Sequence, residues 1–383
     1  MNGSPLVSII ICNYNYGHFL KDAVDSALNQ TYKNVEVIVV DDGSTDNSCE
    51  IIYDYGKTII PVLKENGGQA SAFNEAFKVS SGQIIIFLDA DDTLFPTVIE
   101  KVVNIFIRDE VVKVHWPLLR IDSNGITSGD VVPPHKLAEG NLLEELINSG
   151  PGIFCGKLFS SPTSGNAWSR YFLEKVFPIP EEEFKTGGID FYLTALAPVY
   201  GRIECFNQPL GYYRVHGNND TLKPVAEYLV TFFTWFEISC SNVSSHLKNI
   251  KINVDPESWP RNSWYHKIDK SILDITTIVP EKAHFILVDD DLLSLQNNIA
   301  GRHRLHLIVV TAEYGGSPEN DEAAIEQIKL HAKNGVSSII FAWTSFWWLE
   351  HYKDMCNYLQ SNYKLLIKNE RLIGYDLLAN LNE

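Results

Sequence analysis

Short apolar runs alternate with amphipathic segments along the first part of the chain. Each run is bounded by turn residues, which is typical of strands buried on both faces of a parallel sheet. The segments between them place apolar residues at helical spacing. The alternation predicts an α/β fold with a mostly parallel sheet and right-handed crossovers. The expected strands are 7–12, 35–40, 59–63 and 84–88, and the expected helices between them include 19–29 and 70–79.

Acidic residues and an aromatic ring follow these strands where each one ends. Asp89 and Asp91 come directly after the strand at 84–88, Asp42 follows the second strand, and Tyr14 follows the first. Ligands of open α/β sheets bind at this edge. A Mg²⁺ or Mn²⁺ ion could bridge the two carboxylates to phosphates. The ring of Tyr14 could stack on a base, and Asp42 could accept a base N–H. An isolated Asp-x-Asp is otherwise most simply an acidic surface turn.

Two common nucleotide-binding motifs are missing from this region. The first strand is not followed by GxGxxG, and no GxxxxGK[ST] is present. The sequence therefore does not favour a dinucleotide-binding Rossmann domain or a P-loop.

Several motifs, taken in order, resemble the family 2 glycosyltransferases, which have the GT-A fold. The similarity covers roughly residues 5–220, and its motifs are Val-Ser-Ile-Ile-Ile-Cys-Asn-Tyr-Asn from residue 7, Ala-Leu-Asn-Gln-Thr-Tyr from 27, Val-Ile-Val-Val-Asp-Asp-Gly-Ser-Thr-Asp from 37, Asn-Gly-Gly from 66, Asn74, and Leu-Asp-Ala-Asp-Asp from 88. The resemblance implies that Cys12, Tyr14 and Asp42 contact the base. Relatives often carry a hydroxyl residue where Cys12 stands, which leaves the identity of the base open. Asn74 is expected to belong to the nucleotide-binding set, and Asp89 to contact the ribose.

The resemblance also implies a catalytic base and a metal site. The stretch Gly-Gly-Ile-Asp from residue 187 stands where relatives carry an acidic residue at a helix start, so Asp190 is the expected general base. A plain helix cap is the alternative role for Asp190. Asp89 and Asp91 are the expected ligands of Mg²⁺ or Mn²⁺, and His216 is expected to complete the metal shell. Arg214 is a second candidate, which could close over the diphosphate.

Composition narrows the possible partners and compartment. Lys and Arg number 31 against 48 Asp and Glu, so the net charge of −17 disfavours nucleic acid and anionic membranes as general partners. The six cysteines form no CxxC pair, which is typical of a reducing compartment. No signal-peptide pattern and no apolar run of about 18 residues is present. We expect a cytoplasmic protein without a membrane span, for which peripheral membrane association stays possible.

The second part of the chain changes character. Residues 221–280 are aromatic and apolar at helical spacing and predict a helical linker region, whereas 281–383 return to an α/β pattern. The expected domains are thus a catalytic domain at 1–220, the helical linker, and a small Rossmann-like domain at 281–383. The last resembles a C-terminal module appended to bacterial glycosyltransferases. Its role is expected to be docking or binding, with a second active site at the acidic run 289–291 as the alternative.

The predicted function is an inverting glycosyltransferase of class EC 2.4, similar to hexosyltransferases. It would move a sugar from a nucleotide-diphosphate donor, most simply a UDP-sugar, to a glycan or lipid-linked acceptor in bacterial polysaccharide or glycoconjugate synthesis. The QxxRW pattern of processive relatives is absent, which predicts one transfer per encounter. A nucleotidyltransferase is one alternative, but the loop at 13–18 lacks the Lys or Arg that a triphosphate would need. A non-catalytic nucleotide-sugar-binding protein is the other.

Overall fold

The computed structural model describes most of the chain and divides it into two compact units. The described residues are 4–107, 110–151, 160–217, 219, 225–259, 264–289, 298–307, 309–310, 313–314 and 316–380. Contacts between Cα atoms assign Met1–Leu222 and Thr231–Pro260 to the first unit, and Lys223–Val230 and Arg261–Glu383 to the second. The boundaries 220 and 280 expected from the sequence remain a prediction.

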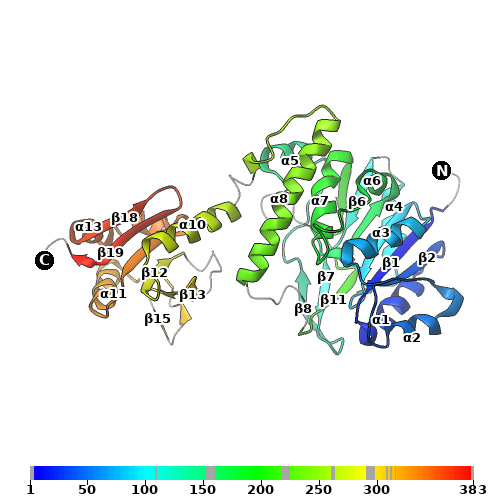
Figure 1. The fold of residues 1–383 in the computed structure, drawn as a ribbon, viewed down its shortest axis with the longest axis horizontal. Helices are drawn as coiled ribbons and strands as arrows, with labels where there is room; N and C mark the ends of the chain where they lie inside the picture. The colour runs from blue at the N-terminus through cyan, green and yellow to red at the C-terminus, as the bar shows by residue number, and fades with distance from the viewer. Residues whose placement is uncertain are drawn as a thin grey trace. The chain divides into compact units, whose positions relative to one another are not determined.

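The first unit is built on a seven-stranded sheet in the order β10-β6-β9-β4-β1-β2-β3. Its neighbouring strands pair in parallel except at β9, which is antiparallel to both β4 and β6. The sheet is therefore mixed but mostly parallel, and β1 and β2 can be followed side by side in blue in Figure 1. The strands are β1 (Val7–Asn13), β2 (Val35–Asp41), β3 (Ile60–Leu63), β4 (Ile84–Asp89), β6 (Val111–His115), β9 (Asn166–Ser169) and β10 (Arg202–Cys205).

Helices cover both faces of this sheet because its central strands are apolar on both sides. On one face, Ile9 of β1 and Ile86 of β4 pack in one cluster with Leu20 and Val98. On the other face, the ring of Phe87 stacks on a helical phenylalanine, Phe73, with centroids 4.2 Å apart. The helices are α1 (Gly17–Leu28), α2 (Ser48–Asp54), α3 (Gln69–Val79), α4 (Val98–Phe106), α5 (Leu143–Ser149), α6 (Arg170–Val176), α7 (Ile189–Tyr200) and α8 (Val225–Asn249).

A second, four-stranded sheet was not predicted from the sequence. Its order is β5-β11-β7-β8, and its strands are β5 (Thr93–Leu94), β7 (Leu118–Ile121), β8 (Thr127–Val132) and β11 (Gly211–Arg214). The strands are short, and β5 and β11 come from distant parts of the chain, so local periodicity gives little sign of the sheet. The sheet matters for the site because β11 brings Arg214 and the residues after it to the acidic turn that follows β4.

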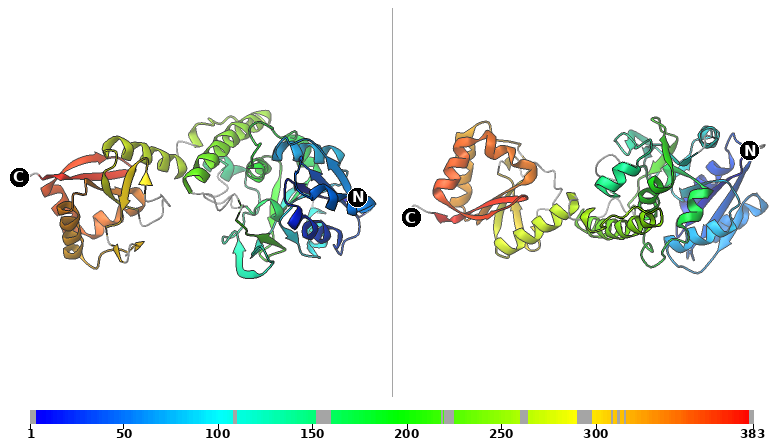
Figure 2. Two further views of the ribbon diagram at one scale, coloured as in Figure 1. Left: turned by 60° about the horizontal axis from the view of Figure 1, so that its bottom comes forward. Right: turned by 90° about the horizontal axis from the view of Figure 1, so that it is seen from above.

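The second unit contains a six-stranded mixed sheet between two layers of helices. Alternate residues of β12 (His284–Val288) face opposite layers, with Ile286 in the cluster that contains helix α11 and Leu287 in the cluster that contains α10. Figure 2 shows α11 and α13 side by side on one side of the sheet. The remaining elements are α10 (Trp264–Ile278), β13 (Asn298–Ile299), β14 (Arg302–Leu305), β15 (Val309–Val310), β16 (Glu313–Tyr314), α11 (Asp321–Lys333), β17 (Ser338–Ala342), α12 (Trp347–His351), α13 (Lys353–Asn362), β18 (Tyr363–Lys368) and β19 (Leu372–Asn380).

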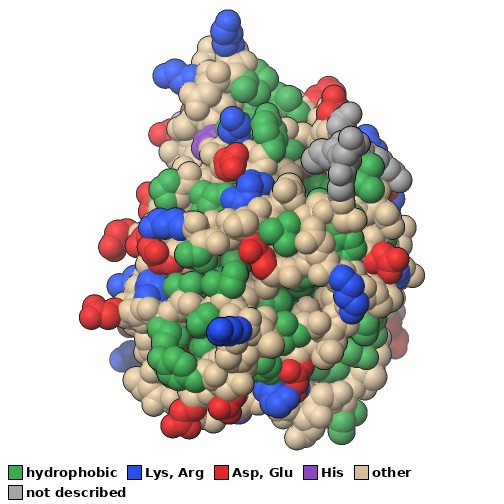
Figure 3. Space-filling model, turned by 90° about the vertical axis from the view of Figure 1, so that its right-hand side faces the viewer, with side chains coloured by type: hydrophobic (Ala, Val, Ile, Leu, Met, Phe, Trp, Pro, Cys, Tyr) green, Lys and Arg blue, Asp and Glu red, His purple; other side chains and the backbone are tan. Residues whose placement is uncertain are grey.

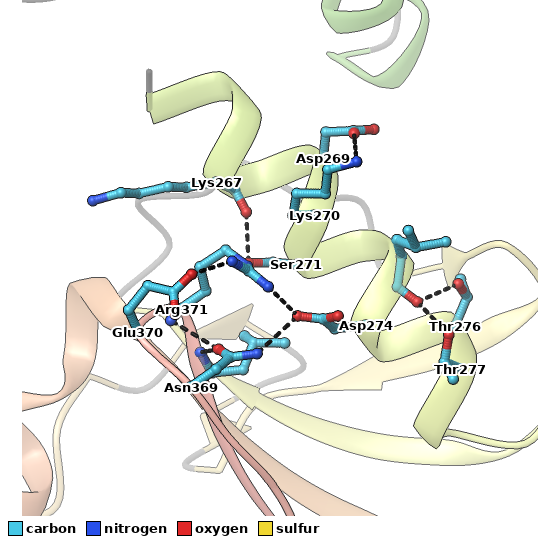
Figure 4. Close-up of polar contacts among 12 residues, drawn as sticks. Lys267, Asp269, Lys270, Ser271, Asp274, Thr276, Thr277, Asn369, Glu370 and Arg371 are labelled. Carbon is cyan, nitrogen blue, oxygen red and sulfur yellow. Dashed lines mark hydrogen bonds and ion pairs between the residues drawn. The ribbon is translucent and has the colours of Figure 1, made fainter. Parts of the chain in front are cut away.

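Polar contacts fasten α10 to the turn between β18 and β19. One carboxylate oxygen of Asp274, in α10, accepts hydrogen bonds from Arg371 at 2.9 Å and from the side chain of Asn369 at 3.0 Å (Figure 4). Arg371 also pairs with its neighbour Glu370. The Asp274 and Arg371 side chains are only about a quarter exposed or less, so solvent screens this pair less than an open surface pair.

Replacing Asp274 by asparagine is expected to loosen the second unit. The charged hydrogen bond to Arg371 would be lost, which costs about 1.5–3 kcal/mol of unfolding free energy. Chemical denaturation of the full chain, followed by tryptophan fluorescence, measures the change. Asp269→Asn is the matched control, because Asp269 is mostly exposed on the same helix and its nitrogen–oxygen distance to Lys270 is 4.0 Å. Equal destabilisation by both variants would contradict a specific role for Asp274.

Acidic and basic side chains are interspersed with hydrophobic ones on the face shown in Figure 3. None of the helices in the described part of the chain combines the length and the apolar character that crossing a bilayer requires.

The acidic run after β12 is only partly described: Asp290 and Asp291 lie outside the described residues. Asp289 is buried and forms an ion pair of 2.6 Å with Arg304.

Candidate active site

The strand ends that the sequence singled out meet at one edge of the first sheet. The register places Cys12 of β1 opposite Asp89 of β4, and Asn13 opposite Asp41 of β2. A cavity of about 530 Å³ opens at this edge. Its lining includes residues from six separate stretches of chain: Cys12, Asn13, Tyr14, Tyr16, Asp42, Asn66, Gly68, Gln69, Ala72, Asp89, Ala90, Asp91, Lys185, Thr186, Tyr213 and Asn219.

The carboxylate of Asp42 is held firmly at the wall of this cavity. Its Oδ1 accepts hydrogen bonds from Lys64 at 2.6 Å and from the Gly67 N–H at 2.9 Å, and its Oδ2 accepts one from the Gly68 N–H at 2.8 Å. Asp42 is 4% exposed, so these donors replace the water that the charge would otherwise need. An ionised carboxylate has about four lone-pair sites, and one on Oδ2 remains for a ligand.

Side-chain hydrogen bonds tie the loop after β1 to the turn after β2. The amide of Asn13 donates to Asp41 at 2.8 Å, and the side-chain oxygen of Asn15 accepts from the Thr45 N–H at 2.7 Å. The turn needs a glycine at Gly43, where φ is +77° and a Cβ would lie 2.6 Å from the Asn66 nitrogen. These contacts fix the positions of the two loops that carry Tyr14 and Asp42.

Tyr14 and Cys12 offer different surfaces to a ligand. Tyr14 is 46% exposed although it lines the cavity, which leaves a ring face free for stacking. Burial raises the pKa of the Cys12 thiol well above its usual value, and the charges of Asp89 and Asp42 add to the effect. Cys12 is thus a neutral S–H at the floor of the site, with weaker hydrogen bonding than a hydroxyl.

Three carboxylates crowd the turn after β4. Burial and the charge of Asp91 raise the pKa of Asp89 and of Asp92 well above the ordinary value. Like charges this close disfavour simultaneous ionisation unless a positive charge balances them. A positive charge placed at this turn would therefore stabilise the ionised carboxylates.

Asp92 has a structural task that its neighbours do not share. It is 1% exposed, and its two oxygens accept hydrogen bonds from the Ser164 hydroxyl at 2.6 Å and from the Arg214 backbone N–H at 2.8 Å. Ser164 also accepts a hydrogen bond from the backbone N–H of Asp89. Asp92 therefore anchors the acidic turn to β11 and to the segment before β9.

Arg214 does not point into the cavity. Its guanidinium donates to the Asp91 carbonyl at 2.9 Å and to Asp22 at 3.0 Å, and lies over the ring of Phe19. The side chain is 4% exposed. The alternative that Arg214 closes over a diphosphate does not fit these contacts, and the residue instead braces the acidic turn from behind.

His216 contacts the acidic turn through Asp91. Its Nε2 lies 2.9 Å from Oδ2 of Asp91, and both side chains are largely buried. Within the described ranges, no three His, Cys, Asp or Glu side chains already converge as a complete metal site. Mg²⁺ in nucleotide enzymes usually takes one or two carboxylates plus phosphate oxygens, so an incomplete protein shell is compatible with such a site.

Asp190 stands in the first turn of α7. It does not line the cavity, and its negative charge adds to the burial and the Asp91 charge that raise the pKa of Asp89. Burial raises the pKa of Asp190 itself, whereas a hydrogen bond from the Phe191 N–H lowers it. The helix begins after Gly188, whose φ is +83° and where a Cβ would lie 2.4 Å from the ring of Trp235. A carboxyl with a raised pKa beside a ligand cavity has the properties of a general base.

Comparison with known proteins identifies the family. A model of glycosyl transferase family 2 matches residues 8–160. An uncharacterized glycosyltransferase of Nostoc sp. is 36% identical over 223 residues, which is 57% of this chain and 67% of the relative. This chain belongs to glycosyl transferase family 2. It is a glycosyltransferase of class EC 2.4 that takes its sugar from a nucleotide-sugar donor.

Other relatives match only in part. An uncharacterized glycosyltransferase of Rickettsia typhi is 49% identical over 102 residues, 27% of this chain and 32% of that protein. The hyaluronan synthase of Pasteurella multocida is 42% identical over 113 residues, 29% of this chain and 12% of its own length. Among solved structures, S. aureus TarS 1–349 in complex with UDP-GlcNAc is 16% identical, with 72% of this chain and 82% of that chain covered and a TM-score of 0.48.

Asn74 is a predicted ligand-binding residue that does not line the cavity of the glycosyltransferase, and the same holds for His216. It is 3% exposed, donates to the carbonyl of Ile179 at 2.9 Å and accepts from the N–H of Ile179 at 2.8 Å. Both ends of the amide are therefore used inside the protein, and Asn74 is absent from the cavity lining. Its contacts fit a role in holding α3 to the segment that leads to α7.

Several residues of this transferase site were missed by sequence reasoning. Ser164 bonds to Asp92, and the ring of Trp235 lies against Gly188. Both are far along the chain from these partners, and neither belongs to a short motif. Lys64 could have been found from the sequence. It directly follows the predicted strand at 59–63, whose end is expected near Asp42, so an ion pair between Lys64 and Asp42 could have been predicted. Lys185 and Thr186 line the cavity just before the Gly-Gly that starts α7, and only the fold places them there.

Proposed function

We propose that the enzyme is an inverting, non-processive glycosyltransferase that uses a UDP-sugar and Mg²⁺ or Mn²⁺. The observation that carries the proposal is the convergence of Tyr14, Asp42, Asp89 and Asp91 on one cavity, with Asp190 beside it. The acceptor would be the hydroxyl of a glycan or lipid-linked saccharide in bacterial polysaccharide or glycoconjugate synthesis.

The free lone pair on Asp42 favours uracil as the base of the donor. Three donors already occupy this carboxylate. The single remaining site suits the one ring N–H of uracil, whereas guanine presents a ring N–H and an adjacent amino group that need two acceptors. Tyr14 would stack on the flat face of the base, and Cys12 would pack beneath it.

The reaction would be a single displacement at the anomeric carbon. Asp190 would accept the proton of the acceptor hydroxyl as its oxygen bonds to the anomeric carbon. The bond from that carbon to the diphosphate oxygen breaks at the same time, and its electron pair leaves with the nucleoside diphosphate. Because attack comes from the side opposite to the leaving group, the configuration inverts. Asp42 and Tyr14 contribute by holding the donor in line with the acceptor.

The side chains around the acidic turn provide the types of ligand that a divalent cation prefers. Carboxylate oxygens of Asp89 and Asp91 and the imidazole of His216 suit Mg²⁺ or Mn²⁺. Burial and neighbouring carboxylates raise the pKa values of Asp89 and Asp92. A bound divalent cation would balance this negative charge. When bound, the cation would supply charge compensation to the departing diphosphate.

Removal of divalent cations is expected to abolish turnover. EDTA should reduce nucleoside diphosphate release to background, and added Mn²⁺ or Mg²⁺ should restore it. Without the cation, the negative charges of the carboxylates would repel the departing diphosphate. Addition of Ca²⁺-saturated EDTA serves as the control for effects of the chelator itself. Full activity in EDTA after exhaustive dialysis would contradict the metal proposal.

We infer that the second unit is a Rossmann-like domain with a docking or binding role. The mixed sheet between helical layers supports the Rossmann-like fold. The ion pair between Asp289 and Arg304 supports a docking or binding role, because it uses the Asp289 carboxylate that a second active site would need. The division into domains at about residues 220 and 280 belongs to the same proposal.

A panel of nucleotide-sugars tests the proposed function. Each donor would be incubated with Mn²⁺ or Mg²⁺, and free nucleoside diphosphate would be measured. Slow, metal-dependent release from a UDP-sugar, accelerated by a suitable acceptor, is the expected result. Selective release from a GDP- or dTDP-sugar would overturn the base assignment. UDP binding without release from any donor, with acceptors included, would support a non-catalytic binding protein.

A further inference from the structure

Lys185 is the one basic residue among the described residues that line the cavity of the candidate site. It is exposed, and no acidic side chain in the described part of the chain forms an ion pair with it. Lys64 differs in both respects, because it does not line the cavity and is bound to Asp42 at 2.6 Å. The ammonium of Lys185 is therefore available to a ligand in the cavity.

The main chain of Lys185 is anchored to the start of α3. Its carbonyl accepts a hydrogen bond from the Gln69 N–H at 2.8 Å. This close approach requires a glycine at Gly68, where a Cβ would lie 2.4 Å from the carbonyl oxygen of Lys185. The preceding residue, Phe184, is fully buried, and its ring centroid lies 5.0 Å from that of Tyr192 in α7. These contacts fix the position of Lys185 at the cavity and leave its ammonium unused.

The remaining charged residues of the described lining are carboxylates, namely Asp42, Asp89 and Asp91. A nucleotide-sugar donor brings further negative charge into this cavity through its diphosphate. In a donor with a neutral hexose, the base, the ribose and the sugar carry no charge, so the diphosphate is the anion that an ammonium in the lining can meet. Lysine is a common phosphate ligand, because its ammonium is a compact charge with three hydrogen-bond donors.

We propose that Lys185 binds the diphosphate of the nucleotide-sugar donor and so gives the site its preference for nucleoside diphosphates over nucleosides. This inference rests on the proposed function, which supplies the donor. Lys185 acts from the segment before α7, whereas the acidic turn and any cation bound there act from the end of β4. Because this segment leads into α7, the contact also ties the diphosphate to the element that carries Asp190.

Lys185→Gln removes the charge and keeps the main-chain contacts, so it tests the proposal directly. At constant Mg²⁺, the Kd for UDP, measured by calorimetry, should rise by about 10-fold, the lower end for a hydrogen bond to a charged group at an exposed site. The Kd for uridine, measured by ligand-observed NMR, should stay within about 2-fold of the wild-type value. A purely structural role would weaken both ligands alike. Unchanged UDP affinity, or equal losses for UDP and uridine, would overturn the proposal.

Lys185→Arg and Lys57→Gln are the matched controls. Arginine keeps the positive charge and binds phosphate, so Lys185→Arg should keep the Kd for UDP within about 3-fold of the wild-type value. Lys57→Gln removes the same charge from an exposed residue outside the cavity lining and should leave the Kd unchanged. If either control lost as much affinity as Lys185→Gln, a specific charge contact by Lys185 would be contradicted.

Sugar nucleotides with and without a second anion identify the group that Lys185 contacts. Lys185→Gln should weaken UDP, UDP-glucose and UDP-glucuronic acid by the same factor, because all three share the diphosphate. A loss confined to UDP-glucuronic acid would assign the ammonium to a sugar carboxylate. A rise confined to the KM for the acceptor would assign it to an anion of the acceptor. Either result would overturn the proposal.

The same titrations keep this inference separate from the proposed function. Binding of uridine by the wild type, weakened in Asp42→Asn, would support the base site whatever Lys185 does. Equal UDP affinity in the wild type and in Lys185→Gln would then overturn the assignment of Lys185 alone. If the wild type prefers another base, the matching nucleoside and its diphosphate replace uridine and UDP, with the same expected ratio. A wild type that binds no nucleoside diphosphate would overturn both.

Discussion

Asp190→Asn is expected to lower kcat by about 10²–10⁴-fold, the contribution typical of a general base. Asparagine has nearly the same size and keeps an oxygen that can accept the hydrogen bond from the Phe191 N–H, so the start of α7 should persist. The amide cannot take up the proton of the acceptor hydroxyl. Donor binding should be retained, because Asp190 does not line the cavity.

The measurements for this variant are nucleoside diphosphate release at saturating donor and UDP affinity by calorimetry. Asp130→Asn serves as the control, since it makes the same chemical change at an exposed position of β8. Wild-type turnover in Asp190→Asn would remove Asp190 as the base and leave it the alternative role of a helix cap. Loss of UDP affinity alongside turnover would point to a disturbed cavity.

Asp42→Asn is expected to weaken UDP binding by roughly 10- to 150-fold, the equivalent of about 1.5–3 kcal/mol for a hydrogen bond to a charged group. The new amide has one oxygen for three protein donors, from Lys64, Gly67 and Gly68. Its NH₂ would also face the base N–H, so two donors would oppose each other. The largely shielded ammonium of Lys64 would lose its carboxylate partner.

The same substitution should therefore also lower the free energy of unfolding, by about 1–3 kcal/mol. Calorimetric titration with UDP well below the unfolding transition separates the loss of affinity from the loss of stability. Asp54→Asn, at the exposed end of α2, is the control for the change of net charge. Unchanged affinity for UDP with an unchanged preference over GDP would contradict the assignment of Asp42 to the base.

The local pattern was sufficient to predict the first strands and the edge that carries the site. The apolar run at 84–88 became β4, which ends at Asp89. The run at 7–12 became β1, which extends one residue further to Asn13. Parallel strands bring their carboxyl ends together, so a correct prediction of the strands also places Tyr14, Asp42 and Asp89 near one another.

Asn74 and Arg214 show where this reasoning fails. A motif position identifies a residue as important, but it does not distinguish contact with a ligand from contact with the protein. Both ends of the Asn74 amide bond to Ile179, more than 100 residues away. Arg214 donates to the backbone carbonyl of Asp91 and does not line the cavity. Both are polar and buried, and only the surrounding chain determines which way they face.

What the sequence determined by itself is the α/β class, the strand ends and the chemical groups of the site, because periodicity and turn residues act over a few neighbouring positions. The tertiary structure alone decided the second sheet, the support of Asp92 by Ser164, and the hydrogen bonds of Asn74 to Ile179. These features depend on pairing between segments about 50 to 120 residues apart. Such pairing is set by the packing free energy of the whole unit, for which no short stretch of sequence carries the signal.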